Sequence, residues 1–376
     1  MRRSRGLAPN FSPINFQKDA QKILAMGAEP NATIAISTAE QIFVSQYLGN
    51  HKSLESPLSY QKLKNQIANL FNFEPSTILV EQHKENLIYR NTKKIDLQKE
   101  CVVIPIQHHE AHFAAVLAEN KLLEKKEPVL GFIWDSAGYG NDCQIWGGEV
   151  FLFDQNKLNR VAQLDYFPQL MGNKMNKEPR LSGLSVLKDF PLSQKLLHKY
   201  FSETEWQFYQ NQLTNKEAIQ TSSMSRLIDA VACILGIASV SSFEEEAGMQ
   251  LEALANRCPY PSYDSYNLPI SNGIIDWRPL IHEILHDWQQ KEPNEIIAWK
   301  FFYSLAKAIA KISTHFFIDK LAFSGSVFQN ALLTDLILEQ LQQKRELFFH
   351  QQLSPNDECI SLGQLAWYSK FYHSSS

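Results

Sequence analysis

The chain has 376 residues, of which 44% are hydrophobic and 20% charged, and its formal net charge at pH 7 is −4. This composition is typical of a globular protein, and the length allows two lobes that each have a core. The small net charge gives no electrostatic reason to expect a nucleic acid as a partner. The five cysteines include no C-x-x-C pair, which argues against a disulfide framework or a zinc ribbon and favours a reducing cytoplasm.

The first residues, 1–13, are basic but contain no apolar run of the kind that a signal peptide needs. The longest apolar run, 227–240, contains Asp229 and is too short to span a bilayer, so it predicts a buried helix. We therefore expect a cytoplasmic protein that has no membrane partner.

The first half of the chain is predicted to consist mainly of strands with two helices. Strands are predicted at 33–36, 41–44, 77–80 and 102–106, and helices at 57–73 and 110–120. A charged linker at 124–127 leads into a strand, a glycine-containing loop and two further strands, at 129–134, 135–142, 144–153 and 160–166.

The middle of the chain is predicted to be mostly helical, and the end alternates between strands and helices. Apolar residues recur at helical spacing in 224–236, 244–256 and 294–316. The final elements are a strand at 320–324, a helix at 327–342, a strand at 346–349 and a helix at 360–372. Strands followed by a helix occur once before and once after residue 127, which predicts a two-lobed α/β protein. Ligands of such folds bind at the carboxyl ends of strands, so the loops after strands are the candidate sites.

The first candidate loop, Gln-His-His-Glu-Ala-His at 107–112, follows a strand and opens a helix. Residues four apart share a helical face, so His108 and His112 can bind one metal ion and leave room for carboxylate or water ligands. A solvated helix start with incidental histidines fits the same pattern, and the motif alone does not decide between the two.

The second and third candidate loops follow the strands that end near 134 and 323. In 135–141, small residues would let backbone N–H groups approach a phosphate, and Asp135 could bind a metal ion, although a plain hairpin uses similar residues. In 323–330, a tight turn would aim a helix N-terminus at an anion or a nucleotide, although an ordinary strand-to-helix turn fits equally. An aspartate in the position of Asp357, before the last helix, is most often an N-cap.

The order of these motifs carries a resemblance to a known family. The series is His-x-x-x-His, a strand into Trp-Asp-x-x-Gly-Tyr-Gly, Ser-Gly-x-Val-Phe-Gln-Asn, and Asn-Asp before a final helix. It resembles the carbamoyltransferase domain of the HypF family of hydrogenase maturation proteins and, more distantly, the tRNA threonylcarbamoyl transferases. Further similar segments are 2–6, 27–29, 45–49, 145–149, 221–223 and 227–232.

The resemblance implies an α/β fold of the two-lobed actin-like (ASKHA, RNase H-like) type. Its first lobe would comprise 1–127, joined by the C-terminal helix 360–376, and its second lobe 128–359, with a helical insertion at about 178–316. A divalent metal, iron or zinc, and ATP or carbamoyl-adenylate would bind between the lobes.

The resemblance also implies roles for individual residues. The implied metal ligands are His108, His112, Asp135 and Asp357. Asp135, His109 and Arg180 are the implied catalytic residues, with Arg180 in a segment that lines the cleft. The implied nucleotide-binding residues are Ser136, Gly138 and Gly140 around the phosphates, Asp229 at the ribose hydroxyls, and Gly325 and Asn330 beside the adenosine.

The activity that the resemblance implies is transfer of a carbamoyl group from carbamoyl-adenylate to the C-terminal cysteine of a HypE-like partner, in nickel-iron hydrogenase maturation. In the family, acylphosphatase, zinc-finger and adenylate-forming domains precede this part. We therefore expect the chain to need an adenylate-forming domain supplied in trans.

The loops depart from the family pattern at several glycines. Ser136-Ala137-Gly138 stands for Gly-Thr-Gly, and Glu245 stands where the family has a glycine near phosphate. An added carboxylate repels a polyanion by on the order of 1–2 kcal/mol at a semi-exposed position. Two alternative functions follow: a catalytically impaired homologue that binds a nucleotide or a partner, and a small-molecule O-carbamoyltransferase.

Overall fold

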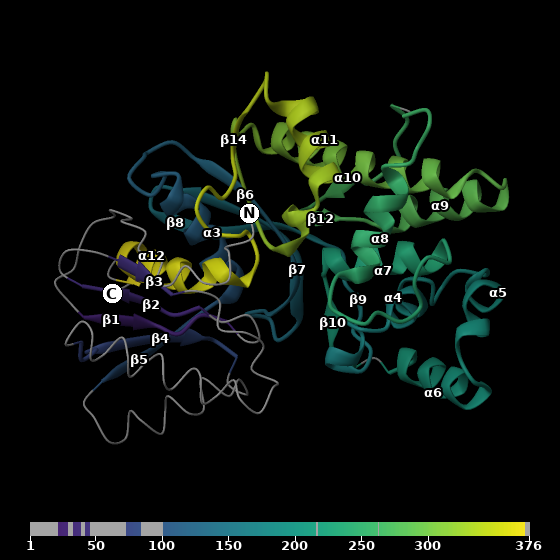
Figure 1. The fold of residues 1–376 in the computed structure, drawn as a ribbon, viewed down its shortest axis with the longest axis horizontal. Helices are drawn as coiled ribbons and strands as arrows, with labels where there is room; N and C mark the ends of the chain where they lie inside the picture. The colour runs from purple at the N-terminus through teal and green to yellow at the C-terminus, as the bar shows by residue number, and fades with distance from the viewer. Residues whose placement is uncertain are drawn as a thin grey trace.

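The computed structural model describes residues 22–28, 33–38, 42–45, 73–83, 101–215, 217–261 and 263–372 (Figure 1). Except for Phe73, the predicted helix at 57–73 lies outside these residues, as does the similar segment at 2–6. The five cysteines are all described, and all are free thiols. Of the helices in the described ranges, none is long and apolar enough to cross a membrane.

The first sheet is built from short, mostly buried strands near the N-terminus. They are β1 (Ile23–Ala25), β2 (Ala35–Ser37), β3 (Ile42–Val44), β4 (Thr77–Glu81) and β5 (Val102–Ile106). Their order is β3-β2-β1-β4-β5, in which β2 is antiparallel to β1 and β3, and β4 is parallel to β1 and β5.

The second sheet repeats this connectivity, and its first three strands are longer than their counterparts. Its corresponding strands are β6 (Val129–Tyr139), β7 (Ile145–Asp154), β8 (Lys157–Leu164), β13 (Lys320–Ser324) and β14 (Glu346–Phe348). Their order is β8-β7-β6-β13-β14, with the first two pairings antiparallel and the last two parallel. Two sheets with one shared pattern make the two-lobed actin-like α/β fold, and the predicted fold class is confirmed. Shorter strands also belong to this sheet: β9 (Phe167–Pro168), β10 (Gln220–Thr221), β11 (Ile270–Ser271) and β12 (Ile274–Ile275).

Two helices lie between the sheets. Helix α3 (His108–Glu119) follows β5 and packs on β6, β7 and β13, whereas α12 (Ile360–Phe371) follows β14 and packs on β1, β2 and β4 (Figure 1). The helices approach closely at Gly363, where a Cβ atom would lie 1.9 Å from the Ala111 carbonyl oxygen. Each helix therefore follows one sheet in the chain and covers the other.

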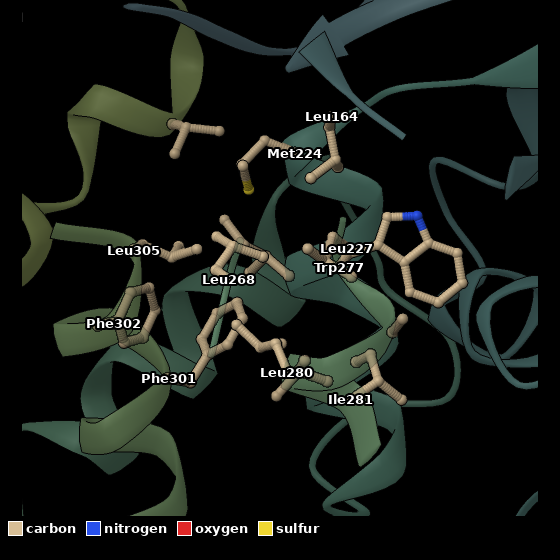
Figure 2. Close-up of a cluster of buried hydrophobic side chains, with 14 of the residues drawn as sticks. Leu164, Met224, Leu227, Leu268, Trp277, Leu280, Ile281, Phe301, Phe302 and Leu305 are labelled. Carbon is tan, nitrogen blue, oxygen red and sulfur yellow. The ribbon is translucent and has the colours of Figure 1, made fainter. Parts of the chain in front are cut away.

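A helical insertion separates β8 from β13 in the chain and forms the teal and green part of Figure 1. Its α-helices are α4 (Pro179–Val186), α5 (Ser193–Leu197), α6 (Glu203–Leu213), α7 (Met224–Ile234), α8 (Glu246–Ala255), α9 (Arg278–Gln289) and α10 (Asn294–Phe316). Side chains such as Leu227, Leu280 and Phe301 meet in its core (Figure 2). The three predicted long helices in this region correspond to α7, α8 and α10.

We propose that the lobes divide between residues 127 and 128, immediately before β6. The C-terminal helix then belongs with the first lobe, because α12 packs on the first sheet. Helix α3 is the exception, since it precedes the division but covers the second sheet.

The predicted loop at 135–142 is wrong for its first half. Strand β6 continues to Tyr139, and its pairing with β7 resumes at Gly138 opposite Trp146 after an irregularity between Trp134 and Gly138. An irregularity of this kind lets a strand absorb extra residues and continue. The glycine-containing segment therefore ends a strand, and the turn to β7 lies at 140–144.

A candidate metal centre beside a nucleotide cavity

The N-terminus of α3 positions two histidines. The Gln107 side chain accepts a hydrogen bond from the Glu110 backbone N–H at 2.8 Å, and this N-cap starts the helix at His108, two residues before the predicted start. His108 and His112 then lie one turn apart on the same face, and both are buried. The helix start is therefore buried and not solvated, and the metal-binding role of the two histidines stays a prediction.

The alternation of side chains along β6 directs Asp135 toward these histidines. Phe132 and Trp134 belong to the core of the helical insertion, whereas Ile133 belongs to the core that contains α3. Because successive side chains point to opposite faces, Asp135 shares the side of Ile133. Its Oδ1 atom accepts a hydrogen bond from the Ser326 backbone N–H at 2.9 Å, which ties β6 to the turn after β13.

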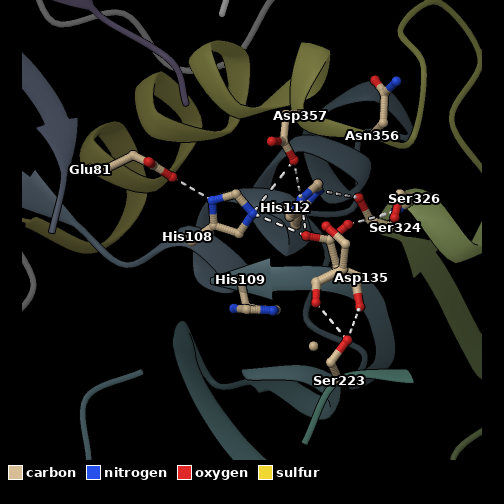
Figure 3. A network of polar contacts seen from close by, with 12 residues as sticks. Glu81, His108, His109, His112, Asp135, Ser223, Ser324, Ser326, Asn356 and Asp357 are labelled. Atoms are coloured by element: carbon tan, nitrogen blue, oxygen red, sulfur yellow. Dashed lines mark hydrogen bonds and ion pairs between the residues drawn. The ribbon is translucent and has the colours of Figure 1, made fainter. Parts of the chain in front are cut away.

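Four side chains from three parts of the chain converge at this point (Figure 3). Asp135 Oδ2 lies 3.2 Å from His108 Nε2 and 3.7 Å from His112 Nε2. Asp357 Oδ1 lies 3.6 Å from each of the same two nitrogens. Asp357 does not cap α12, whose N-cap is Cys359.

Three of these four distances are too long for a hydrogen bond, and all four are compatible with ligands of one metal ion. Metal–ligand bonds of about 2.1 Å in a tetrahedron would place the ligand atoms about 3.4 Å apart. His112 Nε2 is buried and has no hydrogen-bond partner among the described residues, so a ligand bond would satisfy it. Two imidazoles and two carboxylates form a donor set that zinc and iron both accept.

The Nδ1 atom of each of the two histidines, which faces away from the proposed metal position, also has a partner. His108 Nδ1 bonds to Glu81, at the end of β4. His112 Nδ1 lies 3.1 Å from Ser324 Oγ, which in turn lies 2.8 Å from His350 Nε2. Partners of this kind orient a metal-binding imidazole and fix which nitrogen carries its proton.

The electrostatics of the cluster favour a cation. Burial would lower the pKa of His108, but the Glu81 and Asp135 carboxylates raise that pKa to about 10. Burial likewise opposes protonation of His112, yet its pKa is raised well above the ordinary value by Cys359 and Asp135. The surplus of negative groups thus holds protons on the imidazoles, and a divalent ion could replace them.

Of the two remaining predicted catalytic residues, His109 lies beside the cluster, with its ring centroid 5.2 Å from that of His108, whereas Arg180 lies in the helical insertion. His109 is buried, and burial together with its neighbour His108 lowers its pKa well below the ordinary value. The Arg180 guanidinium contacts Glu178, Tyr200, Phe201 and Glu205, all in the helical insertion. The structure does not bring Arg180 together with the cluster, and the catalytic roles of both residues stay predictions.

A cavity of about 300 Å³ lies on the other side of the turn that holds Asp135. It is lined by residues of α7, α8 and the turn after β13, among them Asp229, Glu245, Ser326 and Asn330. Gly325 precedes Ser326 and has φ of 104°, a conformation that favours glycine. The structure thus brings two of the six predicted nucleotide-binding residues, Asp229 and Asn330, to one cavity, and a third, Gly325, directly precedes a residue that lines it.

The other three predicted nucleotide-binding residues are on β6 and just after it. A Cβ atom at Gly138 would lie 2.6 Å from His109 Cε1, and one at Gly140 would lie 2.1 Å from Trp146 Nε1. The Ser136 carbonyl accepts a hydrogen bond from Ser223 Oγ at 2.5 Å. Close packing explains both glycines, and a phosphate-binding role for the three positions stays a prediction.

Three residues that contact the predicted metal-binding histidines or their partners were not predicted from the sequence. Glu81 ends β4, Ser324 ends β13 and His350 follows β14. All three therefore lie at carboxyl ends of parallel strands, and the rule that drew attention to the three loops would have found them too.

Comparison with known proteins identifies the family. Residues 131–364 match the family described as "Carbamoyltransferase, Kae1-like Domain, second subdomain", and residues 18–119 match the "HypF Kae1-like domain". The carbamoyltransferase HypF of Synechocystis sp. is 32% identical over 97% of this chain and 49% of its own length. A HypF homolog of Cupriavidus necator is 25% identical, over 93% of this chain and 91% of its own length.

Solved structures agree with these matches. Full-length HypF in a phosphate- and nucleotide-bound form is 28% identical, with a TM-score of 0.85, over 97% of this chain and 58% of that one. HypF from T. kodakarensis, at 24% identity, has a TM-score of 0.87 and the same fold. The chain spans about half the length of most curated relatives that it matches. The chain belongs to the HypF family of carbamoyltransferases, of which it represents the Kae1-like domain.

Proposed function

We propose that the chain transfers a carbamoyl group from carbamoyl-adenylate to the thiol of the C-terminal cysteine of a HypE-like partner, in nickel-iron hydrogenase maturation. The observation that carries the proposal is the position of the His108, His112, Asp135 and Asp357 cluster beside the cavity that Asp229 lines. The turn at Ser326 joins the two, because its N–H bonds to Asp135 and its residue lines the cavity. The protein would act in the cytoplasm.

In this reaction the chain would hold the adenylate and present its carbamoyl carbon to the partner. Asp229 would bind the ribose hydroxyls, and Asn330 would lie beside the adenosine. The four ligands would hold a divalent ion, iron or zinc, which when bound supplies a Lewis acid for a carbamoyl or phosphate oxygen.

The bonds change at one carbon. The thiolate sulfur of the partner, having lost its proton to solvent, would attack the carbamoyl carbon and form a carbon–sulfur bond. The bond between that carbon and the phosphate oxygen breaks, and AMP leaves with the electron pair. The nucleophile comes from the partner, so none of the five cysteines of this chain is needed.

The test is transfer of labelled carbamoyl to a HypE-like protein, with carbamoyl-adenylate supplied by an adenylate-forming domain in trans. We expect label on the partner with the metal-loaded wild type and none above background with Asp357→Asn. Asp335→Asn, which changes an exposed aspartate on α11 (Ala331–Leu341), is the matched control and should transfer normally. Absence of transfer by the metal-loaded wild type would overturn the proposal.

A further inference from the structure

Glu245 has an unusual backbone for its residue type. It precedes α8 with φ of 70° and ψ of 1°, in the left-handed region that favours glycine. A residue with a Cβ atom pays roughly 1 kcal/mol to adopt this conformation. Strain of this kind often marks a side chain that must occupy a particular place.

That place is the cavity beside the cluster. The Glu245 side chain lines the cavity together with those of Asp229 and Glu252. Asp135 and Asp357 add negative charge from the cluster, near enough to influence ionisation of Glu245. No lysine or arginine is among the described residues that line this cavity.

A buried cation lies next to residues that line the cavity. Arg226, on α7, is 1% exposed, and none of its three guanidinium nitrogens has a hydrogen-bond partner among the described residues. Its Nη2 atom lies 3.1 Å from Asp229 Oδ2, and its charge also acts on Glu245. A guanidinium cannot lose its charge, so leaving it without hydrogen bonds is costly unless an anion approaches it.

We infer that Glu245 sets the selectivity of this cavity by charge, so that it admits a nucleoside with a single esterified phosphate and disfavours nucleoside di- and triphosphates. The inference rests on the proposed function, since it assumes that the cavity holds an adenylate. The Glu245 carboxylate interacts with the positive charge of Arg226, which is then less available to a ligand phosphate. It also adds to the negative charge of Asp229 and Glu252.

The selectivity has a chemical use. The phosphate of carbamoyl-adenylate is bonded through two oxygens and carries one negative charge, whereas the polyphosphate chains of ADP and ATP carry more. The ionised Glu245 carboxylate therefore weakens binding of ADP and ATP more than binding of the adenylate. The cavity would then accept the activated intermediate in the presence of ATP.

The experiment measures binding of four probes to the full chain at one metal content: adenosine, the methyl ester of AMP, AMP and ADP. It is run at alkaline pH, above the pKa of about 7 that burial gives Glu245, so that the carboxylate is ionised. The proteins are the wild type, Glu245→Gln, Glu245→Gly and the control Glu244→Gln, which alters a neighbouring carboxylate that does not line the cavity. Glu245→Gly keeps the left-handed turn without a side chain, so it should fold even if the glutamine is poorly tolerated.

We expect the wild type to bind ADP more weakly than the methyl ester. Both Glu245 variants should bind ADP about tenfold more tightly than the wild type, with adenosine affinity changed by less than about twofold. Glu244→Gln should behave as the wild type.

The inference is overturned if the ratio of ADP to adenosine affinity is the same in the wild type and both Glu245 variants, or if no protein binds adenosine. Carbamoyl transfer to the partner is a separate readout. Transfer with unchanged ratios would contradict this inference alone, and altered ratios without transfer would contradict the proposed function alone.

Discussion

His112 and Ser324 are 212 positions apart in the chain, yet His112 Nδ1 lies 3.1 Å from Ser324 Oγ. The histidine comes from α3, after the first sheet, and the serine ends β13 in the second sheet. Ser324 also contacts His350 Nε2, and His350 Nδ1 lies 2.9 Å from the buried Glu119 carboxylate. The orientation of the His112 ring is therefore set by residues that the sequence holds far from it.

Ser324→Ala should weaken metal binding without removing a ligand. Loss of the hydroxyl leaves His112 Nδ1 with only Cys359 Sγ, at 3.3 Å, as a partner among the described residues, and loss of such a hydroxyl lowers metal affinity by about tenfold. Competition with a chelator of known affinity measures the effect, and the metal content at saturation should remain that of the wild type. Ser313→Ala on α10, another buried serine whose hydroxyl bonds to a backbone carbonyl, is the control. Equal affinities in Ser324→Ala and the wild type would show that this contact does not support the metal.

Gly363→Ala should destabilise the protein, because its Cβ atom would lie 1.9 Å from the Ala111 carbonyl oxygen where α3 and α12 cross. The helices would have to separate, at a cost of at least about 2 kcal/mol in the free energy of unfolding. Gly183→Ala in α4 is the matched control, since its nearest new contact would be at 3.4 Å. Denaturant unfolding compares the two, and an unchanged stability of Gly363→Ala would mean that the helices lie further apart than the structure places them.

Glu245→Gln should stabilise the protein in a pH-dependent way. Burial, together with the Asp135 and Asp357 charges, raises the pKa of Glu245 from 4.5 to about 7, although Ser326 and Arg226 oppose the rise. An acid whose pKa is higher in the folded state destabilises that state once ionised, so the wild type loses stability as the pH rises from about 4.5 to about 7.

The glutamine variant lacks this loss. Its advantage should be small at acidic pH and reach on the order of 2 kcal/mol above neutral pH, allowing for the partial exposure of Glu245. Unfolding free energies of both proteins at acidic and at alkaline pH provide the measurement. A difference that does not grow with pH would mean that Glu245 ionises as freely in the folded protein as in the unfolded chain.

Local patterns predicted the fold well where apolar residues recur at the regular spacing of a helix or of a strand. The apolar spacing of α10 and the strands β5 and β13 needed no tertiary information, and the order of motifs indicated the actin-like fold. The end of β6 could not be predicted, because glycines such as Gly138 suit a turn as well as a strand that passes close to the His109 ring. The distance between His112 and Ser324 likewise depends on each sheet being covered by the helix that follows the other.

Only part of the site could be predicted from the sequence, because only part of it forms a local pattern. His108 and His112 form a local pattern, whereas Asp357 gained its expected role only from the family resemblance. The strain at Glu245 is a property of the backbone, which composition and spacing do not reveal.

The central claim is that His108, His112, Asp135 and Asp357 hold one metal ion. Its most direct test is the metal content of the purified chain by elemental analysis, after incubation with iron or zinc and removal of unbound ions. We expect about one ion per chain in the wild type and in His198→Gln, which alters a histidine in the helical insertion, and far less in His112→Gln. A wild type that retains no ion, or a His112→Gln variant that retains as much as the wild type, would contradict the account.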